Sequence, residues 1–582
     1  MNKFYSTVMC AVLTASAASA QLVAPGILTQ QSTKSYSGIV TEKNAARSNA
    51  MAYDADNSLF TAGVFDTEFE GLEPIAASSY IMKNGSSLTP SWKVAIQGAA
   101  TVTCLLADGQ GGVYAAGNFA DEVSFGSTDN NPVIKEGYKE SGAFTTSLCA
   151  SFVAHYDKDG KLLKVASFTP AHDPALDATG MYFAYDGDIY CNINSIAKDA
   201  DGNLYAGFSY CGQLKAGDNA ITSGSMDLDG GSFYFQALKA AAVGKLNADL
   251  NIDSFVLNIS TRSFTQLQAS EQVYSSKMTI DGNHLYFGAA STGEAYCDYL
   301  LSASGSSRIT YTAKSSTEGI NYCISLADID LSKKTMRDNI IGCVTEDSFN
   351  AMSIGNLEVA GDNIVMTGNF HGTLSSSESN YVKAVGSSDM YIATFNSSNL
   401  AVNNLTATAY DEGDKTKNEE LFTSSAVCGD YVFINGYADL KSGHAFTAPL
   451  SYIYNIKDAS LTKLNVDNYT LGIAATSNGA ALANAFSASP ITGITFADYK
   501  VTQAGVNDIV ANANAVKAYP NPTTDVLNFS NECDVEIAGV NGAIVASAKG
   551  VSSINVEALP AGIYFVKTTT AAGSAVVKVI KK

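Results

Sequence analysis

The residue types that carry out catalysis do not form recognisable motifs in this 582-residue chain. The five histidines have no helical or strand spacing that pairs them, and stand at His155, His172, His284, His371 and His444. The sequence holds no HExxH zinc motif, no GxSxG nucleophile elbow and no GxxxxGK[ST] phosphate loop. Carboxylate pairs for glycoside hydrolysis stay open, because such pairs assemble from residues far apart in sequence. We therefore predict no catalytic residue and favour binding over hydrolysis.

Four acidic runs resemble pieces of a calcium-binding loop: Asp54-Ala55-Asp56, Asp157-Lys158-Asp159-Gly160, Asp199-Ala200-Asp201-Gly202 and Asp227-Leu228-Asp229-Gly230. A complete loop needs further oxygen ligands and a glutamate after the glycine, and no run supplies that set. Asp and Gly are also residues that tight turns favour. We expect turns here and no cofactor, with calcium as the less favoured alternative.

A repeated segment in the middle of the chain must position any functional residues there. It consists of a turn rich in Asp, Gly and Asn, an alternating apolar strand, a glycine and usually an aromatic residue. Turn residues of these types accept positive φ at little cost, and the later glycine suits a bulge or a place where two backbones crowd together. Each copy is predicted to be the returning strand of a β-hairpin. Seven copies occur, at residues 54–65, 108–119, 199–208, 281–289, 361–370, 429–437 and, more degenerate, 477–486.

A second hairpin is predicted after most copies, at 78–96, 151–168, 322–344, 388–407 and 451–466. Two hairpins make a four-stranded antiparallel sheet, and seven such sheets arranged radially make a seven-bladed β-propeller. The seventh copy lacks a clear second hairpin, so residues 22–41 are expected to supply its missing strand and close the ring. The extra length, greatest at 120–150, 212–235 and 290–320, is expected to form loops on one face, where recognition residues concentrate.

Residues 1–20 have the features of a secretory signal peptide. Lys3 supplies the positive start, residues 8–15 the apolar stretch, and Ala18-Ser19-Ala20 a small-residue cleavage site. No later segment reaches the ~18 consecutive apolar residues of a transmembrane helix, so no transmembrane segment is expected. The mature protein is therefore expected to be exported and soluble.

The body is strongly acidic. The chain has a formal net charge of −21, Lys3 leaves with the signal peptide, and residues 517–582 hold six Lys against five Asp or Glu, so the remainder carries −23 by subtraction. Such a surface repels nucleic acid and anionic lipids, which excludes nucleic acid as an expected partner. It suits solubility outside the cell, or attraction of a basic partner.

Export permits disulfides, and two pairs of cysteines flank predicted hairpin turns. Cys191 and Cys211 are each ten residues from Asp201, and a turn at 332–335 places Cys323 almost opposite Cys343. Opposed residues on antiparallel strands lie close enough to bridge, so we predict disulfides Cys191–Cys211 and Cys323–Cys343. The alternative is that all are buried thiols. Cys533 is expected to be a thiol in the core of the C-terminal domain, and Cys104, Cys149, Cys297 and Cys428 are left unassigned.

The C-terminal residues form a separate segment. Residues 21–510 are assigned to the repeat domain and 511–516 to a small polar linker. From Pro520-Asn521-Pro522 onward the chain alternates as strands do, with an Asn-Gly turn at Gly542, the segment LPAGIYFVK with Gly562 and Tyr564, and a basic end with Lys578, Lys581 and Lys582. This pattern predicts a small immunoglobulin-like β-sandwich of about seven strands over 517–582.

These pieces, in this order and at the terminus, resemble the type A C-terminal sorting domain of the type IX secretion system. The resemblance implies passage across the outer membrane of a Gram-negative bacterium by that machinery, removal of the domain, and usually attachment at the cell surface. The body is similar, more diffusely, to a repeat family of secreted bacterial propellers through Phe152 to Gly160 and Asp389 to Phe395. The fold supports many functions, so this second resemblance implies architecture only.

The expected function is that of a cell-surface or secreted binding or adhesion module for an unknown extracellular ligand. One alternative is a secreted glycan- or peptide-degrading enzyme with carboxylates near the central channel. Another is a structural protein of a surface layer, which would self-associate. Trp92 is the only tryptophan, which argues against a polysaccharide ligand, because sugar rings usually stack on indole. Loop tyrosines such as Tyr138, Tyr182, Tyr296 and Tyr311 could supply contact area.

Overall fold

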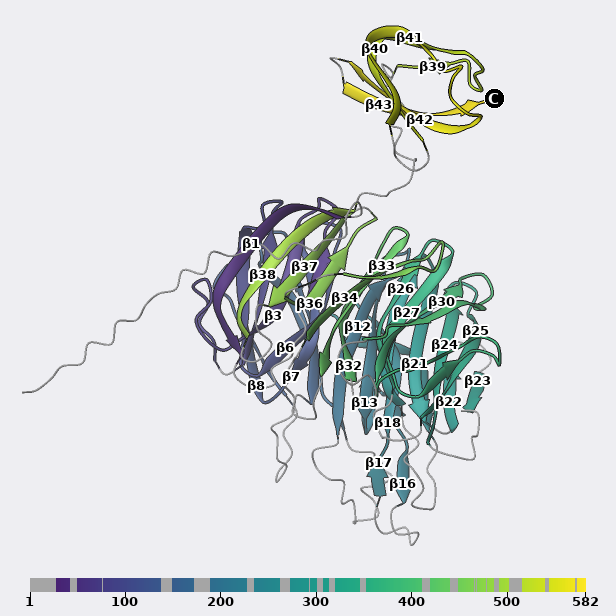
Figure 1. The fold of residues 1–582 in the computed structure, drawn as a ribbon. Coiled ribbons are helices and arrows are strands. Elements are labelled where there is room, and N and C mark those ends of the chain that lie inside the picture. The colour runs from purple at the N-terminus through teal and green to yellow at the C-terminus, as the bar shows by residue number, and fades with distance from the viewer. Residues whose placement is uncertain are drawn as a thin grey trace, which may run out of the picture. The chain divides into compact units, whose positions relative to one another are not determined.

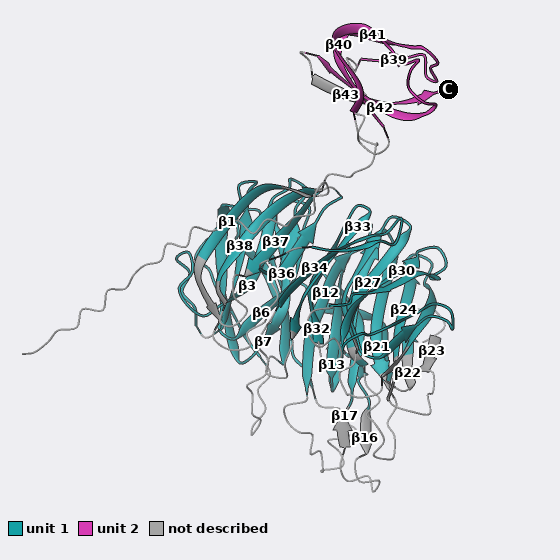
Figure 2. Ribbon diagram, viewed as in Figure 1, with its two compact units in different colours: residues 1–502 teal, residues 503–582 magenta. Residues whose placement is uncertain are grey.

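The computed structural model shows an all-β protein (Figure 1). Contacts divide the chain into two compact units, residues 1–502 and 503–582, which are described separately (Figure 2). The signal peptide and the linker predicted at 511–516 lie outside the described residues. The structure describes residues 28–41, 50–75, 77–137, 149–171, 189–227, 235–261, 273–292, 294–300, 307–312, 320–345, 352–410, 419–439, 448–464, 466, 468–477, 479–485, 491–501, 516–539, 544–570 and 573–582.

The described strands of the first unit form seven large antiparallel sheets. The first three contain β2 (Ala50–Tyr53), β3 (Leu59–Phe65), β4 (Ser78–Asn84), β5 (Pro90–Gln97), β8 (Glu122–Phe125) and β9 (Val133–Glu136); β6 (Ala100–Ala107), β7 (Val113–Phe119), β10 (Ala150–Tyr156) and β11 (Leu162–Phe168); and β12 (Tyr190–Lys198), β13 (Leu204–Cys211), β18 (Lys239–Leu246), β19 (Ile252–Thr261), β22 (Glu294–Tyr299) and β23 (Ser307–Thr312).

The other four continue the same pattern. They contain β20 (Val273–Asp281), β21 (His284–Thr292), β24 (Ile320–Asp330), β25 (Thr335–Thr345), β28 (Thr373–Ser375) and β29 (Tyr381–Lys383); β26 (Met352–Ala360), β27 (Asn363–Phe370), β30 (Asp389–Asn396) and β31 (Val402–Ala407); β32 (Glu419–Cys428), β33 (Tyr431–Asp439), β34 (Ala448–Asn455) and β35 (Leu461–Lys463); and β36 (Tyr469–Ala475), β37 (Gly479–Ala485), β38 (Ile491–Val501) and β1 (Leu28–Thr41). Each repeat copy supplies the second strand of one sheet.

The sheets close into a β-propeller. The first strands contact one another in the cycle β2, β6, β12, β20, β26, β32, β36 and back to β2. The N-terminal strand β1 pairs antiparallel with β38, and Tyr36 lies opposite Ile494. The expectation that residues 22–41 close the ring is confirmed over β1. The five predicted second hairpins are confirmed as β4–β5, β10–β11, β24–β25, β30–β31 and β34–β35.

The repeat glycine lies where two backbones crowd together, as predicted. A Cβ at Gly117 would stand 2.0 Å from the carbonyl oxygen of Thr101, and one at Gly368 would stand 1.9 Å from that of Ser353. Both lie beside a register shift in the preceding strand, such as that between Val102 and Cys104. Any side chain would push the strands apart, so the bulge and the glycine require each other.

Polar side chains beside these bulges join neighbouring sheets. Thr103 Oγ1 donates to the carbonyl oxygen of Ile193 at 2.9 Å, and Asn194 Nδ2 donates to Ser276 Oγ at 2.9 Å. These four residues belong to three consecutive first strands. The residue that a bulge pushes out of the ladder therefore supplies a hydrogen bond across the sheet interface.

The expectation of loops on one face needs correction. Part of the segment 120–150 forms the hairpin β8–β9, in which β8 pairs with β5 of the preceding sheet, and part of 290–320 forms the hairpin β22–β23, in which β22 pairs with β19. The inserted hairpin β28–β29 is joined to β25 in the same way. The segment 212–235 contributes to two small hairpins: β14 (Gln213–Ala216) with β15 (Asn219–Thr222), and β16 (Ser225–Asp227) with β17 (Phe235–Ala237). Open strand edges attract further strands, so the inserted segments widen neighbouring sheets sideways.

Among the second hairpins of the sheets, that of the third sheet escaped the sequence analysis. The third sheet has its second hairpin as β18–β19, whose turn holds Leu250 at a φ of 67°. The corresponding turn of the second sheet has Gly160 at 78°. Leu250 is buried, so burial of its side chain offsets the unfavourable backbone conformation, and no glycine marks the turn.

Both disulfide predictions are wrong by one residue of register. Cys191 lies opposite Tyr210, and Cys211 lies opposite Tyr190, so the two cysteines point to opposite faces of their sheet. In the fourth sheet Cys323 lies opposite Gly342 rather than Cys343. Cys191 and Cys323 are buried, and neither is bonded to its predicted partner. The bulge between Ile193 and Ser195 shifts the first pair, because it adds one residue to only one strand.

The described residues of the second unit form five strands rather than about seven. These are β39 (Ala518–Tyr519), β40 (Val526–Gly539), β41 (Ile544–Asn555), β42 (Gly562–Thr570) and β43 (Gly573–Lys581). Two segments expected as separate strands join in β40, which pairs with β39, β41 and β42. The strands enclose one core with Leu527, Val535 and Val566, and Cys533 is a buried thiol there, as predicted.

Candidate functional site

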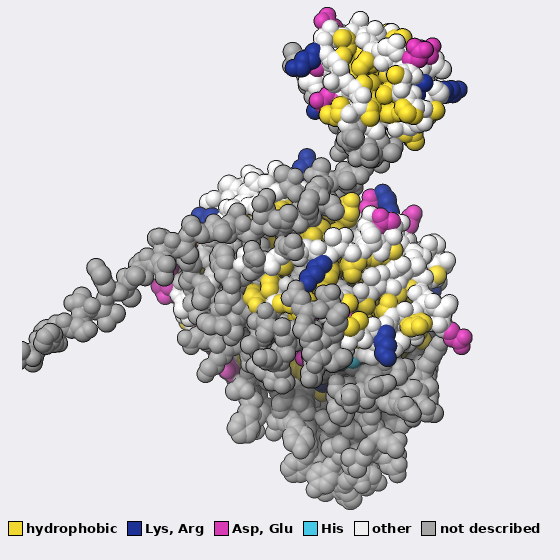
Figure 3. Space-filling model, in the orientation of Figure 1, with side chains coloured by type: hydrophobic (Ala, Val, Ile, Leu, Met, Phe, Trp, Pro, Cys, Tyr) yellow, Lys and Arg dark blue, Asp and Glu magenta, His cyan; other side chains and the backbone are white. Residues whose placement is uncertain are grey.

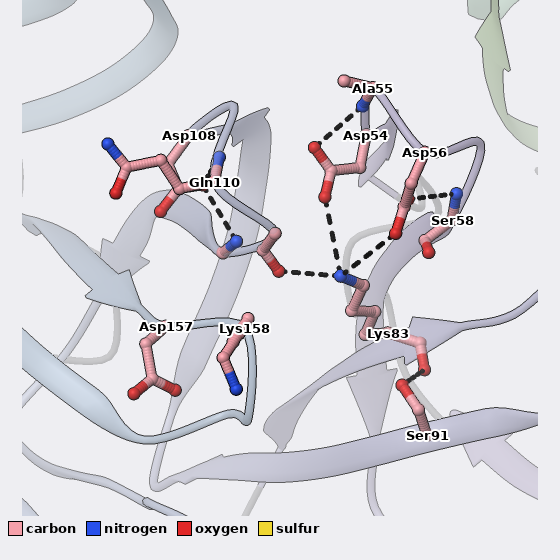
Figure 4. Close-up of polar contacts among 12 residues, drawn as sticks. Asp54, Ala55, Asp56, Ser58, Lys83, Ser91, Asp108, Gln110, Asp157 and Lys158 are labelled. Carbon is pink, nitrogen blue, oxygen red and sulfur yellow. Dashed lines mark hydrogen bonds and ion pairs between the residues drawn. The ribbon is translucent and has the colours of Figure 1, made fainter.

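The acidic runs at 54–56 and 199–202 are turns in which an aspartate side chain accepts hydrogen bonds from nearby backbone N–H groups. Asp54 Oδ1 accepts the N–H of Ala55 at 2.8 Å (Figure 4), and Asp199 Oδ1 accepts those of Asp201 at 3.0 Å and Asn203 at 2.8 Å. The run at 157–160 is built in the same way, whereas the run at 227–230 extends beyond the described residues. The turn interpretation is confirmed for the three described runs.

The first of two turn-side clusters is centred on Lys83 of β4 (Figure 4). Its Nζ lies 3.5 Å from Asp54 Oδ2, 3.9 Å from Asp56 Oδ2 and 2.8 Å from the carbonyl oxygen of Gly111. Gly111 belongs to the turn of the next sheet, so one buried ammonium group joins two sheets. Asp54 is thereby neutralised in a poorly solvated place, where an unpaired carboxylate would be costly.

The second turn-side cluster joins the second and third sheets. His155 Nε2 lies 2.9 Å from Asp108 Oδ2, and its ring stacks on Tyr114 at 4.1 Å between centroids. From the third sheet, Lys198 Nζ stands 4.6 Å from the Tyr114 ring centroid and donates to the carbonyl oxygen of Asp108. Burial alone would raise the pKa of Asp108, but hydrogen bonds from His155 and from backbone N–H groups hold that pKa below its usual value.

A similar histidine–aspartate pair lies in the fourth sheet. His284 Nδ1 is 2.9 Å from Asp328 Oδ1, and the Arg337 guanidinium binds the other oxygen of this buried carboxylate. A carboxylate that orients an imidazole is also part of catalytic triads. Within the described residues, however, each of these imidazoles hydrogen-bonds its aspartate, and neither hydrogen-bonds a serine or a cysteine. The geometry there is that of a structural histidine–aspartate hydrogen bond.

Two glutamates hold the fifth and sixth sheets together, of which Glu420 is buried and Glu358 is half-buried. Glu358 of β26 accepts the N–H of Val427 in β32 at 2.9 Å, and Glu420 of β32 accepts hydrogen bonds from Thr408 and Tyr410, which follow β31. Burial raises the pKa of each glutamate to about 7. Both oxygens of each carboxylate accept a hydrogen bond, and one of those on Glu358 comes from Asn356 of the same strand. Sequence reasoning missed them because nothing local marks a carboxylate that faces another sheet.

Exposed apolar side chains occur on the inserted hairpins. Ile134 of β9 is 59% exposed and Tyr381 of β29 is 59% exposed, with Val133 and Val385 near them in sequence. The sole tryptophan has a different role: Trp92 is buried, donates to the carbonyl oxygen of Lys158 at 3.0 Å and stacks on Tyr156. Of the tyrosines considered for recognition, Tyr296 and Tyr311 lie in β22 and β23, and Tyr138 and Tyr182 fall outside the described residues.

The predicted sorting residues at the two ends of the C-terminal unit meet. Asn521 Nδ2 donates to the carbonyl oxygen of Lys578 at 2.7 Å, and its Oδ1 accepts the N–H of Ile580 at 2.9 Å. Thr523 continues this pairing by exchanging backbone hydrogen bonds with Ile580 and Lys582. The Pro520-Asn521-Pro522 segment is therefore attached to the basic end by a side chain that replaces backbone pairing.

The other sorting residues lie apart from this junction or outside the description. Tyr564 Oη donates to the carbonyl oxygen of Pro560 at 2.8 Å, which pins the LPAG turn, and Gly562 begins β42. Ile563 lies directly opposite Ile580, and both are exposed, beside Lys578 and Lys581. Figure 3 shows apolar side chains gathered on the visible face of this unit. Gly542 lies outside the described residues.

Comparison with protein families agrees with this assignment. Residues 517–582 match the family model "Secretion system C-terminal sorting domain". A search of curated protein sequences gave no match. None of the described residues forms a helix long and apolar enough to cross a membrane, and among them no three His, Cys, Asp or Glu side chains are grouped as metal ligands.

Several solved structures are similar in fold. The Dos1 propeller is 10% identical, with a TM-score of 0.39, covering 81% of this chain and 95% of that one. The polysaccharide lyase Uly1 is 10% identical, with a TM-score of 0.36 and coverages of 79% and 91%. A quinohemoprotein alcohol dehydrogenase from Comamonas testosteroni is 8% identical, with a TM-score of 0.39 and coverages of 86% and 79%. Their different activities transfer nothing to this chain.

The class of protein follows from the closed cycle of sheets and the matched C-terminal family. It is a β-propeller protein with a type IX secretion sorting domain at its C-terminus. The sorting domain implies interaction with the type IX secretion machinery, secretion, and localisation at the cell surface.

Proposed function

We propose that the propeller is a binding module that recognises an extracellular protein through its inserted hairpins. The observation that carries this proposal is that, among the described residues, the charged groups are used in packing while apolar side chains are exposed on the inserted hairpins. The charged clusters and buried carboxylates are used within or between sheets, whereas the inserted strands expose Ile134 and Tyr381. Exposed aliphatic and tyrosine side chains on a rigid scaffold suit a protein interface.

Two further observations favour a protein ligand of basic character. Trp92 is packed between sheets, so it cannot stack on a sugar ring. The body's charge of −23 by subtraction raises the rate of encounter with a positively charged partner. A polysaccharide ligand, enzymatic cleavage and a self-associating surface layer are the competing functions.

The test uses cells that export the full chain. Adherence of these cells to immobilised basic proteins and to a glycan array is compared for the native protein, Ile134→Asp and Tyr381→Ala. Each variant is expected to lower adherence to protein about tenfold or more, since a central interface residue contributes ~2 kcal/mol. Ile75→Asp is the matched control, because Ile75 is 60% exposed and lies outside the inserted hairpins. The proposal would be contradicted if the cells adhered only to glycans. It would also be contradicted if only the Ile75→Asp variant lost adherence to protein.

Enzymatic activity and self-association have their own readouts. Exported protein is incubated with polysaccharide and peptide panels, and we expect no turnover. Cleavage that disappears in a Glu420→Gln variant would establish the hydrolase alternative instead. Sedimentation of the exported protein is expected to show a monomer, and a concentration-dependent polymer would favour the surface-layer alternative.

A further inference from the structure

Two cysteines from different sheets lie next to each other. Cys149 immediately precedes β10 in the second sheet, and Cys191 is in β12, the first strand of the third sheet. The Cys191 N–H donates to the Cys149 carbonyl oxygen at 2.9 Å. The covalent bonds on either side of this hydrogen bond keep the two Cα atoms within about 6.5 Å of each other, which is inside the range that disulfides span.

Their side chains face the same interface. Alternation along an extended segment places Cys149 and Ser151 on one face, and Ser151 Oγ lies 3.4 Å from Cys191 Sγ. Cys191 packs in the apolar cluster that includes Val153 of the second sheet and Phe208 of the third. The charge of Cys149 also contributes to raising the pKa of Cys191, as expected of close neighbours.

The remaining cysteines near this interface are less well placed. Cys211 points to the other face of the third sheet, as the register with Tyr190 shows. Thr103 is hydrogen-bonded to the carbonyl oxygen of Ile193, which places Cys104 further along β12 than Cys191 by about three residues. Strands rise by ~3.3 Å per residue, so this offset exceeds the reach of a disulfide.

We propose that Cys149 and Cys191 form a disulfide in the exported protein and join the second sheet to the third covalently. The oxidant is the disulfide of a thiol-oxidising protein of the periplasm. One cysteine thiolate attacks that disulfide and forms a mixed disulfide, and the second thiolate then displaces the partner's sulfur. Two thiols lose two protons and two electrons, one S–S bond forms, and the oxidant is left as a dithiol.

The order of events follows from burial. Burial raises the pKa of the Cys191 thiol to about 12 in the closed interface, so little reactive thiolate exists there. Oxidation therefore takes place while the two sheets are still coming together. Once the interface has closed, the same burial protects the bond from exchange.

The direct test is peptide mapping of the full chain, exported by cells and recovered under alkylating conditions. Without reduction, we expect one peptide pair that joins Cys149 to Cys191 and is lighter than the two thiol peptides by two hydrogen atoms. The same chain without residues 1–20, kept in a reducing cytoplasm, should yield both cysteines alkylated after unfolding. Exported protein in which Cys191 is alkylated after unfolding, or bridged to any other cysteine, would overturn the proposal.

A stability measurement separates this bond from other effects of substitution. A reductant should lower the melting temperature of the native protein and of the matched control Cys211→Ser, because both keep the bridge. It should leave the melting temperature of Cys149→Ser unchanged. Equal sensitivity of all three proteins to the reductant would also overturn the proposal.

Discussion

The propeller and the sorting domain both bring distant parts of the chain together, but they use different groups to do so. In the propeller, β1 completes the last sheet through a long backbone ladder with β38. In the sorting domain, the side chain of Asn521 makes the corresponding bonds to Lys578 and Ile580. Backbone pairing is open to almost any sequence, whereas side-chain pairing requires one residue type. This difference explains why the sorting domain is recognisable from its sequence and the propeller only from its repeat.

The largest expected effect is on export. Asn521→Ala removes both side-chain hydrogen bonds between the start of the sorting domain and its last strand. We expect this variant to be retained in the periplasm, with no more protein at the cell surface than in cells that lack it. Deletion of residues 578–582 should have the same effect. Immunoblots of cell fractions measure this. Asn531→Ala is the matched control, because Asn531 is exposed and should export normally. Normal surface levels of the Asn521 variant would show that the junction is not the recognised feature.

A large effect on stability is expected from the repeat glycine. Gly368→Ala places a methyl group against the Ser353 carbonyl oxygen, and backbone atoms cannot move aside cheaply. The expected loss is about 3 kcal/mol of unfolding free energy or more. Gly85→Ala should change it by less than ~0.5 kcal/mol, since nothing lies near its added methyl group. Denaturant titration compares the two, and equal effects would mean that the bulge tolerates a side chain.

The two glutamates between the fifth and sixth sheets predict a pH dependence. The pKa of Glu358 and of Glu420 is raised to about 7, so between pH ~4.5 and ~7 the folded state binds more protons than the unfolded state. Stability should therefore fall as pH rises through this window, by on the order of 1–3 kcal/mol per glutamate. Glu358→Gln should flatten the profile, and Glu378→Gln, at an exposed site, should leave it unchanged. A profile that rises over this window in the native protein would contradict the expected sign.

A smaller difference is expected between buried and exposed ion pairs. Lys83→Ala leaves buried Asp54 without its cation and should cost about 2 kcal/mol. Lys164→Ala removes an exposed pair with Asp249 and should cost less than ~0.5 kcal/mol. Thermal unfolding at low and high salt measures both. If high salt diminishes the Lys83 effect as strongly as the Lys164 effect, then the first turn-side cluster is solvated like the surface.

Much of the fold could be predicted because the repeat acts locally. Turns such as 54–58 and 199–203 follow from Asp side chains that bind their own backbone, and alternation identifies the strand after each turn. The hairpin with Leu250 was missed because no local turn signal marks it. Its turn is stabilised by burial of the Leu250 side chain rather than by a glycine. The candidate site was harder to predict from the sequence, because the hydrogen-bond partners of Glu358 and Glu420 lie in a neighbouring sheet.

The sequence by itself determined the strands, the closing role of β1, and the address at 517–582, since turn chemistry, alternation and a terminal motif are properties of neighbouring residues. Only the tertiary structure decided which residues meet across strands and sheets. One bulge residue moved Cys191 away from Cys211. The packing of the second sheet against the third placed Cys149 beside Cys191, although the two are 42 residues apart in sequence by subtraction. Register shifts by whole residues and reverses the face of every side chain, so contacts between sheets depend on long-range pairing that no local pattern contains.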